Sequence, residues 1–552
     1  MNTERNKNSR KGAALLVVLF IIMVITVLSL GFLSQSDTEL ACGKNMVLRT
    51  QIDYLAESGL EHARGQILNP QDAATEYYTG GTEMQLDDGS NDYYDVSVLR
   101  DDSNSMDQCN YIIDCNAFEL KNGEHVGQSN LRAQLRLDPC VAFWTEADTI
   151  ISNSMTIHGD AYCNGALSNN GTIYGDIFAN SVAGTGTKSG QQYSISKLSL
   201  DWPDIRVYGF DDKPGVTYQP GDYTLSDDIS GMLLVNGNLT IQSGSAPHII
   251  ASKNQPAIYV AGDLIIDKDV NLNIEGLAAV KDDILINGDA NLNVLGGLYT
   301  KGALFETTCD SSGNEAFAVL HNGASWSQGK YDGALEFDGN DDYAQVDKEN
   351  IFDITNQITV SAWIKVHSFN RNFQAIVTKG DSSWRLQRYS NTNKIEFACS
   401  GLSHNQYGNI WSNKSVNDSQ WHHVAGVYDG STISIYIDGV LDVSTHTGGQ
   451  INTNNYKVMI GENAQAQERN WNGWIDDVQV YDRSLDVNEI SIIKSGSTVS
   501  NLVSHWKFDE SGANVSIVAS PTKAAVLLWK DDDCTQKWGQ AAGAFYRSIQ
   551  RK

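Results

Sequence analysis

The chain has 552 residues and a net charge of −28, with acidic side chains spread along its length. This length predicts about three or four domains. The acidic balance excludes nucleic acid as an expected partner, because phosphate binding needs a basic face. Glycine is abundant, with 48 residues, and proline is scarce, with 8, so glycine-rich turns between short apolar runs favour a mainly β body.

An uncharged apolar run extends from Ala13 to Leu33. A helix needs roughly 20 apolar residues to cross the hydrocarbon core of a bilayer, so this run predicts a transmembrane helix. Basic residues before it, among them Arg10 and Lys11, favour a cytoplasmic N-terminus. We therefore expect an inner-membrane anchor, with the bulk of the chain periplasmic or at the cell surface. A cleaved signal peptide and an ordinary signal anchor are the alternatives.

The apolar run continues as an amphipathic segment, so that residues 13–69 predict one long helix. This N-terminal region has a basic leader (residues 1–12), a glycine, an apolar half-helix and an amphipathic half-helix. It resembles the stem of type IV pilin-like proteins, in particular minor pseudopilins. The resemblance implies prepilin cleavage between Gly12 and Ala13, and pilin or pseudopilin subunits as partners. Major pilins have glutamate at the fifth mature position, which is Val17 here, and this departure resembles tip-located pseudopilins.

Residues 70–139 contain three segments with alternating apolar residues, which predict a small antiparallel sheet packed on the helix. The chain has eight cysteines and no C-x-x-C pair, so a zinc site is not expected. Cys109 and Cys115 flank a short apolar segment. We expect either a disulfide between them, in an oxidising compartment, or two free buried thiols.

A short pattern recurs in residues 140–301: an apolar residue, a spacer, Gly, and then Asp or Asn. It occurs at 157–160, 173–176, 235–238, 260–263 and 286–289. Repeats of this kind predict a right-handed β-solenoid, in which glycine turns the corner and the acidic or amide side chain caps it. A β-sandwich with coincidental repeats is the alternative.

Residues 302–520 contain five further motifs, found at 333–343, 358–364, 420–428, 434–439 and 471–490. Taken in order, they resemble the laminin-G-like, concanavalin A-like jelly-roll domain. The resemblance implies a two-sheet sandwich, and lectin-like members of this family bind calcium and glycans. The segment 501–512 resembles one that commonly opens the domain. Here it either supplies a closing strand or remains from a second copy, and residues 521–552 are predicted to form a C-terminal tail.

The resemblance implies a calcium site on one turn of the jelly roll. Asp338, Asn340 and Asp341 offer oxygen ligands there, and Asp476 and Asp477 are expected to approach from another strand. Calcium takes six to eight such oxygens, and it is the one cofactor that we expect. Capping of turns is the alternative role for these carboxylates.

Exposed aromatic side chains would supply the stacking surfaces for a glycan. The candidates are Trp384, Tyr407, Trp411 and Trp471. Packing in the core of the sandwich is the alternative for each.

Together these features predict a mainly β, multi-domain protein that is held at a membrane and is not an enzyme. The jelly roll would be a binding head for a glycan or protein ligand, in adhesion or assembly. An extracytoplasmic carbohydrate-active enzyme and a structural pseudopilus component without its own ligand are the alternatives.

Overall fold

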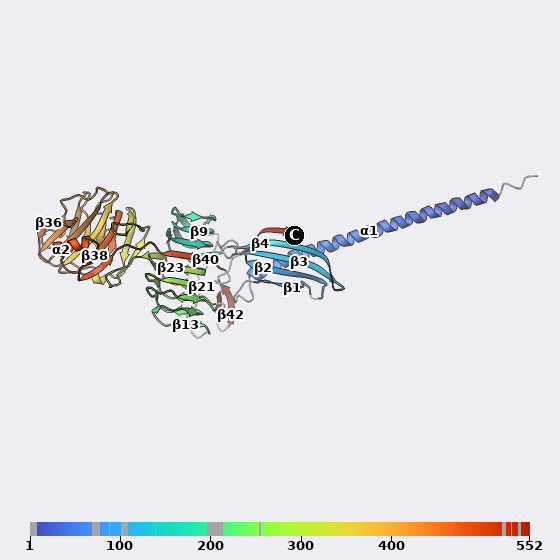
Figure 1. Cartoon of the computed structure of the whole chain (residues 1–552), viewed down its shortest axis with the longest axis horizontal. Coiled ribbons are helices and arrows are strands. Elements are labelled where there is room, and N and C mark those ends of the chain that lie inside the picture. Colours follow the sequence, from blue (N-terminus) through green and yellow to red (C-terminus); the bar gives the residue numbers. More distant parts are fainter. Residues whose placement is uncertain are drawn as a thin grey trace, which may run out of the picture.

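A computed structural model describes residues 8–68, 78–87, 89–100, 109–138, 140–195, 214–252, 255–520, 526–530, 533–538 and 543–551. The molecule is elongated (Figure 1). A long helix leads into an antiparallel sheet, then into a stack of parallel strands, and finally into a two-sheet sandwich at the far end. The expectation of a mainly β chain with one long N-terminal helix is confirmed. The predicted boundaries at 69–70 and at 139 lie outside the described residues.

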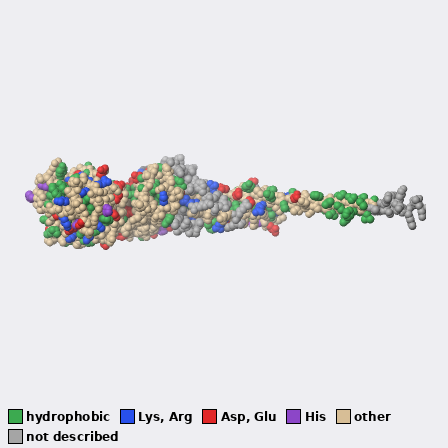
Figure 2. All heavy atoms as spheres, turned by 90° about the horizontal axis from the view of Figure 1, so that it is seen from above, with side chains coloured by type: hydrophobic (Ala, Val, Ile, Leu, Met, Phe, Trp, Pro, Cys, Tyr) green, Lys and Arg blue, Asp and Glu red, His purple; other side chains and the backbone are tan. Residues whose placement is uncertain are grey.

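Helix α1 spans Asn8–Leu68, and Gly12 and Ala13 lie within it. It contains a window that is long and apolar enough to cross a membrane, and this window is not buried by the rest of the chain. Hydrophobic side chains cover this free part of the helix (Figure 2). The helix therefore fits a membrane anchor or a signal sequence. Nearer its C-terminal end it becomes amphipathic and buries Ile52, Leu60 and Ala63 against the neighbouring sheet.

That sheet, here called the head sheet, is antiparallel and has the order β1-β2-β3-β4-β43. Its strands are β1 (Gly80–Met84), β2 (Asp92–Arg100), β3 (Asn110–Lys121), β4 (Glu124–Asp138) and β43 (Gly543–Arg551). The last strand of the chain thus pairs with β4, and the C-terminal end lies beside the first sheet (Figure 1). Sequence analysis had assigned this strand to a separate tail. The tail also contains the hairpin β41 (Val526–Lys530) and β42 (Asp533–Trp538).

A disulfide joins Cys109 to Cys140, with 6.1 Å between their Cα atoms. The expected pair of Cys109 and Cys115 is therefore corrected. Six residues of extended strand span about 20 Å, which is far more than a disulfide can bridge. Cys115 is a free, buried thiol that packs against Gly59 of α1, where a Cβ would lie 2.5 Å from its Sγ.

The next unit, here called the parallel stack, contains the strands from β5 to β24 together with β40. The strands are β5 (Val141–Thr145), β6 (Thr149–Ile151), β7 (Met155–His158), β8 (Asp160–Asn169), β9 (Thr172–Tyr174), β10 (Ile177–Ala183), β11 (Thr187–Lys188), β12 (Gln192–Tyr193), β13 (Val216–Gln219), β14 (Tyr223–Leu225), β15 (Ile229–Ser230), β16 (Met232–Val235), β17 (Leu239–Ile241), β18 (His248–Ile250), β19 (Ile258–Val260), β20 (Leu264–Ile266), β21 (Asn271–Val280), β22 (Ile284–Asn287), β23 (Asn291–Thr300), β24 (Leu304–Thr307) and β40 (Asn514–Ala519).

Acidic side chains cap the turns of the parallel stack, some of them from the repeated motif and one, Asp283, from outside it. Asp263 Oδ1 accepts from the backbone N–H of Asp283 at 2.9 Å, and Asp283 Oδ1 accepts from Ala303 N at 2.8 Å. Asp160 and Asp176 cap the following coils in the same way. The predicted turn-capping role of Asp160, Asp176 and Asp263 is confirmed, because each carboxylate satisfies a backbone amide that the turn leaves without a ladder partner.

Strand β40 lies in the middle of the parallel stack, although it follows the sandwich in the chain. It pairs in parallel with the first half of β23 on one side and with β7 on the other. The second half of β23 pairs with β5. The two halves of the stack, residues 141–193 and 216–307, are therefore joined both directly, through β5 and β23, and through β40, which lies more than 200 residues away from β23 along the chain.

The sandwich contains β25 (Ala318–His321), β26 (Ser325–Gln328), β27 (Gly333–Asp338), β28 (Tyr343–Val346), β29 (Ile358–Val366), β30 (Ala375–Thr378), β31 (Trp384–Arg388), β32 (Ile395–Cys399), β33 (Asn409–Trp411), β34 (Trp421–Tyr428), β35 (Thr432–Ile437), β36 (Val440–His446), β37 (Met459–Ile460), β38 (Asn472–Tyr481) and β39 (Leu502–Trp506). A short 3-10 turn covers Asn350–Phe352, and helix α2 covers Val487–Lys494. The predicted jelly roll is thereby supported.

One sheet of the sandwich runs β25-β28-β37-β30-β31-β32-β33, and the other runs β26-β27-β38-β29-β34-β35-β36. The first sheet continues the parallel stack, because β24 pairs with β25. Strand β39 pairs with β38, so the interpretation of segment 501–512 as a closing strand is confirmed. Alternating apolar residues from both sheets meet in one core.

Candidate functional site

Two of the four aromatic candidates lie in the core of the sandwich. Trp384 and Trp471 are fully buried, and the Trp384 indole donates to the Phe352 carbonyl at 3.1 Å. Neither ring can stack on a ligand, so both assignments are corrected to core packing. For Trp384 the reason is strand parity: in β31, Trp384 and Leu386 point inward, while Arg385 between them points outward.

The other two candidates lie at the edge of the sheet. Trp411 is 42% exposed at the end of β33, and Tyr407 is 59% exposed in the preceding loop. Trp411 stacks on Tyr389, with ring centroids 4.4 Å apart and an interplanar angle of 6°. Sequence analysis missed Tyr389, because its partner comes from a strand more than twenty residues away and no local pattern marks the pair. The two rings form a flat aromatic surface, in which Trp411 is exposed and Tyr389 is half-buried.

A buried polar network lies on the same face of this sheet. Glu396 is 1% exposed, and both of its carboxylate oxygens accept from side-chain amides, Asn409 Nδ2 at 2.7 Å and Gln387 Nε2 at 3.1 Å. Arg469 reaches Gln387 at 3.2 Å and binds Asp381 through two hydrogen bonds of 2.6 and 2.8 Å. Glu396 pairs with Trp411 across the ladder. The network therefore holds the edge strand and its aromatic ring in a fixed position.

The acidic turn after β27 brings three carboxylates together. Ligand oxygens of Asp338, Asp341 and Asp342 lie within 4.8 Å of one another. Asp342 accepts from Asp338 N at 2.8 Å, and burial raises its pKa to about 7, with further contributions from the neighbouring charges of Asp338 and Asp341. Asn340 donates its side-chain amide to Asp338 at 2.7 Å. Arg371 fixes the turn by binding the carbonyls of residues 339 and 340.

Asp476 and Asp477 do not join this cluster. Strand register places Ile475 opposite Leu335 and Asn472 opposite Asp338, so Asp476 lies roughly 13 Å from Asp338 along the strand. Asp476 accepts from the backbone N–H groups of residues 330 and 331, and burial raises its pKa to about 8. Asp477 contacts His505 Nε2 at 2.5 Å. Both assignments to the calcium site are corrected, and Asp342 is the carboxylate that sequence analysis did not include.

Comparisons with known proteins concern the jelly roll. Residues 338–491 match the family model of the concanavalin A-like lectin/glucanases superfamily. This range contains both the aromatic surface and the acidic turn, and the match supports a concanavalin A-like domain here.

A curated alpha-L-arabinofuranosidase of Bifidobacterium longum is 24% identical over 220 residues, which cover 36% of this chain and 20% of that protein. The chain thus spans 20% of the length of this curated relative.

Among solved structures, domain 4 of an extracellular arabinanase from Geobacillus stearothermophilus, in complex with arabinotriose, is similar at 16% identity and a TM-score of 0.26, covering 32% of this chain and 82% of that chain. The botulinum neurotoxin serotype D ligand-binding domain, in complex with N-acetylneuraminic acid, is similar at 19% identity and a TM-score of 0.27. The similarity covers 34% of this chain and 47% of that chain.

Proposed function

We propose that this chain is a membrane-anchored protein that displays a glycan-binding jelly roll. The observation that carries the proposal is the stacked pair of the half-buried Tyr389 and the exposed Trp411 above the buried network around Glu396. Aromatic rings give a rigid apolar surface at low entropic cost, and the polar groups beside them suit the hydroxyls of a sugar. The pair lies at the edge of its sheet, at the opposite end from the parallel stack.

The rest of the chain serves as a stem and a spacer in this proposal. Helix α1 and the head sheet form a pilin-like stem, cleaved after Gly12, that assembles with pilin or pseudopilin subunits. The parallel stack acts as a right-handed β-solenoid that holds the jelly roll away from the membrane. This is supported by the exposed apolar helix and the order of the units along the molecule (Figure 1). Membrane fractionation with N-terminal sequencing tests it, in cells with and without a prepilin peptidase. An intact Met1 in both would contradict the cleavage.

Calcium is proposed at the acidic turn. Asp338, Asp341 and Asp342 would hold it, since clustered carboxylate oxygens match the preference of this ion. A bound cation would neutralise mutual repulsion and stiffen the turn. We expect calcium, but not the same concentration of sodium, to raise the melting temperature of the detergent-solubilised chain. An equal response in an Asp341→Asn variant would contradict the assignment.

Glycan binding is tested with the full chain in detergent on a glycan array, followed by titration of the strongest ligand. Trp411→Ala should weaken binding by about twofold to tenfold, since an aromatic contact contributes roughly 0.5–1.5 kcal/mol. Val487→Ala is the matched control, because Val487 is 53% exposed on α2, away from this face. Unchanged affinity in Trp411→Ala would overturn the proposed site.

Two other functions would give different results in these assays. Release of reducing sugars from a polysaccharide panel would favour a carbohydrate-active enzyme. Co-purification with pseudopilin subunits, without binding to any glycan, would favour a purely structural component.

A further inference from the structure

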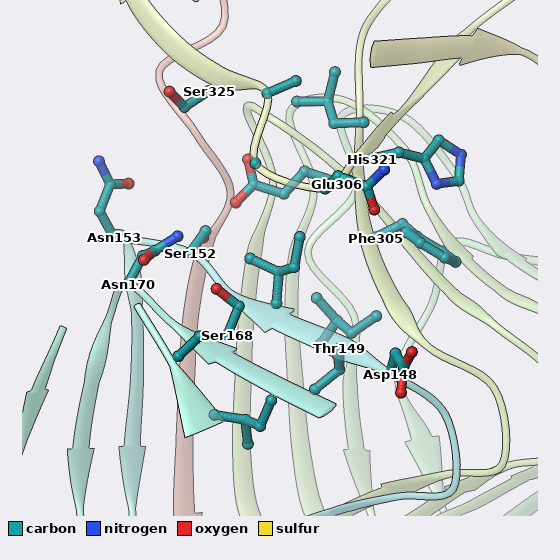
Figure 3. A pocket seen from close by; sticks show the side chains of 18 of the residues that line it. Asp148, Thr149, Ser152, Asn153, Ser168, Asn170, Phe305, Glu306, His321 and Ser325 are labelled. Atoms are coloured by element: carbon teal, nitrogen blue, oxygen red, sulfur yellow. The ribbon is translucent and has the colours of Figure 1, made fainter. Parts of the chain in front are cut away.

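A cleft of about 690 Å³ lies between the parallel stack and the jelly roll. One wall comes from β6, β8 and β10, and the other comes from β24, the end of β25 and the segment that leads from β25 into β26. Figure 3 shows Thr149 and Ser168 on the first wall, opposite Glu306 and His321. Its volume is within the range of small-molecule sites. The cleft is separate from the aromatic surface, because β25 and β33 lie at opposite ends of their sheet, six strand spacings or roughly 29 Å apart.

Three buried polar atoms of residues that line this cleft have no hydrogen-bond partner of good geometry within the described part of the chain: Thr149 Oγ1, Glu306 Oε1 and His321 Nε2. Thr149 is only 4% exposed and Glu306 only 9%. A buried polar group that is not hydrogen-bonded costs free energy, so such groups are rare in folded proteins. Their convergence on one cleft indicates a partner that brings several hydrogen-bonding groups at once.

Glu306 is the most constrained of the three. Trp326 Nε1 donates to its Oε2 at 2.6 Å, which fixes the carboxylate on the side of the jelly roll. Burial raises its pKa, and Ser152, Trp326 and the Ala513 backbone lower it in part. Ser152 and the Ala513 backbone lie near the carboxylate, but among the described residues Oε1 has no hydrogen-bond partner of good geometry.

The remaining lining limits the chemistry of the partner. Among the described residues that line the cleft, none is Lys or Arg, so an anionic ligand would meet no compensating charge. The amides of Asn153 and Asn170 and the hydroxyl of Ser168 can donate and accept. The Phe305 and His321 rings lie 5.0 Å apart and add apolar surface. The carboxylates of Asp148 and Asp341 also line the cleft and can accept hydrogen bonds. A neutral, polyhydroxylated molecule, which brings many hydroxyl donors, fits this combination.

We propose that the cleft binds a saccharide, as a second site formed jointly by the parallel stack and the jelly roll. Hydroxyl groups of the sugar donate to Glu306 Oε1 and His321 Nε2, and one exchanges a hydrogen bond with Thr149 Oγ1. The proposal does not depend on binding at Tyr389 and Trp411.

The test uses the detergent-solubilised full chain carrying Trp411→Ala, so that the aromatic surface does not contribute. Neutral trisaccharides, for example cellotriose, are titrated by calorimetry, with spermidine as a cationic probe. Thr149→Val in this background should weaken trisaccharide binding about tenfold and should leave the melting temperature of the free protein equal or higher, because the hydroxyl that it removes has no partner there. Glu306→Gln should also weaken binding. Thr240→Val, on β17 outside the cleft, is the matched control.

The expected pattern for Thr149→Val is therefore an equal or higher melting temperature together with weaker trisaccharide binding, whereas Thr240→Val should leave binding unchanged. No binding of any trisaccharide to the Trp411→Ala chain would overturn the proposal. Equal affinity in Thr149→Val and Thr240→Val, or binding of spermidine in place of the saccharides, would also overturn it. A failure of the proposed Tyr389–Trp411 site is recognised separately, from unchanged glycan affinity in the chain that carries only Trp411→Ala.

Discussion

Asp342 is a carboxyl group with only 4% of its surface exposed, placed beside two other carboxylates. Its pKa is raised to about 7, mainly by burial. Between the ordinary pKa near 4 and about 7, the folded chain holds a proton that the unfolded chain has lost. The free energy of unfolding should therefore fall as pH rises through this window.

Replacing Asp342 by Asn tests this pH dependence. The carboxamide oxygen still accepts from Asp338 N, but it does not ionise. We expect the variant to lose less stability than the natural chain between pH 4 and pH 7, with a difference of roughly 2–4 kcal/mol across the window. Thermal melts of both chains at half-unit pH steps, without calcium, measure it. Parallel curves would contradict the assigned titration.

The aromatic residues illustrate what the sequence does and does not reveal at this scale. The motif around Trp384 and Trp471 is typical of the jelly-roll family, but residue type alone does not tell an inward from an outward ring. For Trp384 the direction of the ring follows from the alternation of inward and outward side chains along β31. The pairing of Trp411 with Tyr389 depends on strand register between distant segments, which no window of local sequence contains.

Each coil of the parallel stack depends on a cap from the coil before it. Asp263→Ala would leave Asp283 N without its acceptor, at a cost of about 1–2 kcal/mol. Asp263→Asn keeps an acceptor and removes a carboxylate whose pKa is raised by burial and by nearby acids. Asn238 already fills the equivalent position one coil earlier, accepting from Asp263 N at 3.0 Å.

Hydrogen exchange at the peptide that contains Asp283 measures this difference locally. We expect exchange there to be roughly five- to thirtyfold faster in Asp263→Ala, and unchanged or slower in Asp263→Asn at pH 7. Equal exchange in both variants would show that the side chain does not act as a cap.

The disulfide between Cys109 and Cys140 closes a loop around β3 and β4 and ties the head sheet to β5. Closing a loop of this length restricts the unfolded chain and stabilises the fold by roughly 3–4 kcal/mol. Cys140→Ser should destabilise the head sheet by about this amount, whereas Cys115→Ala should leave the bond intact. Peptide mapping without reductant, with alkylation before and after denaturation, distinguishes the two. A peptide linking Cys109 to Cys115 would contradict the pairing.

The sequence predicts the capping acids Asp160, Asp176 and Asp263, because the apolar–x–Gly–Asp motif is local and its acid acts on the next parallel strand segment. It does not predict Asp283, which caps without belonging to the motif. The sequence also predicts the antiparallel strands of the head sheet, because the alternation of apolar residues lies within each strand. It does not predict where β40 and β43 pair, since a six-residue alternating strand such as Asn514–Ala519 fits any sheet edge. Their positions are decided by the sum of contacts in the folded chain.

On the scale of the whole molecule, the chain passes outward through its units and then returns through them. Strand β40 re-enters the parallel stack after the jelly roll, and β43 re-enters the head sheet. The domains suggested by sequence as consecutive segments are therefore interleaved. The parallel stack cannot bury its full core until residues 514–519 have been added, because Val515 and Ile517 belong to that core.

Two truncations test this dependence. A chain ending at Asp509 lacks β40 and leaves facing edges of β23 and β7 unpaired. We expect the parallel stack in this chain to be cleaved rapidly by protease, while the jelly roll, whose strands are complete at Trp506, resists. A chain ending at Ser520 is the matched control, because it keeps β40 and lacks only the later strands. Its stack should remain resistant. If both chains gave the same protease-resistant fragments, β40 would be an accessory strand, and the outward and return paths of the chain would fold independently.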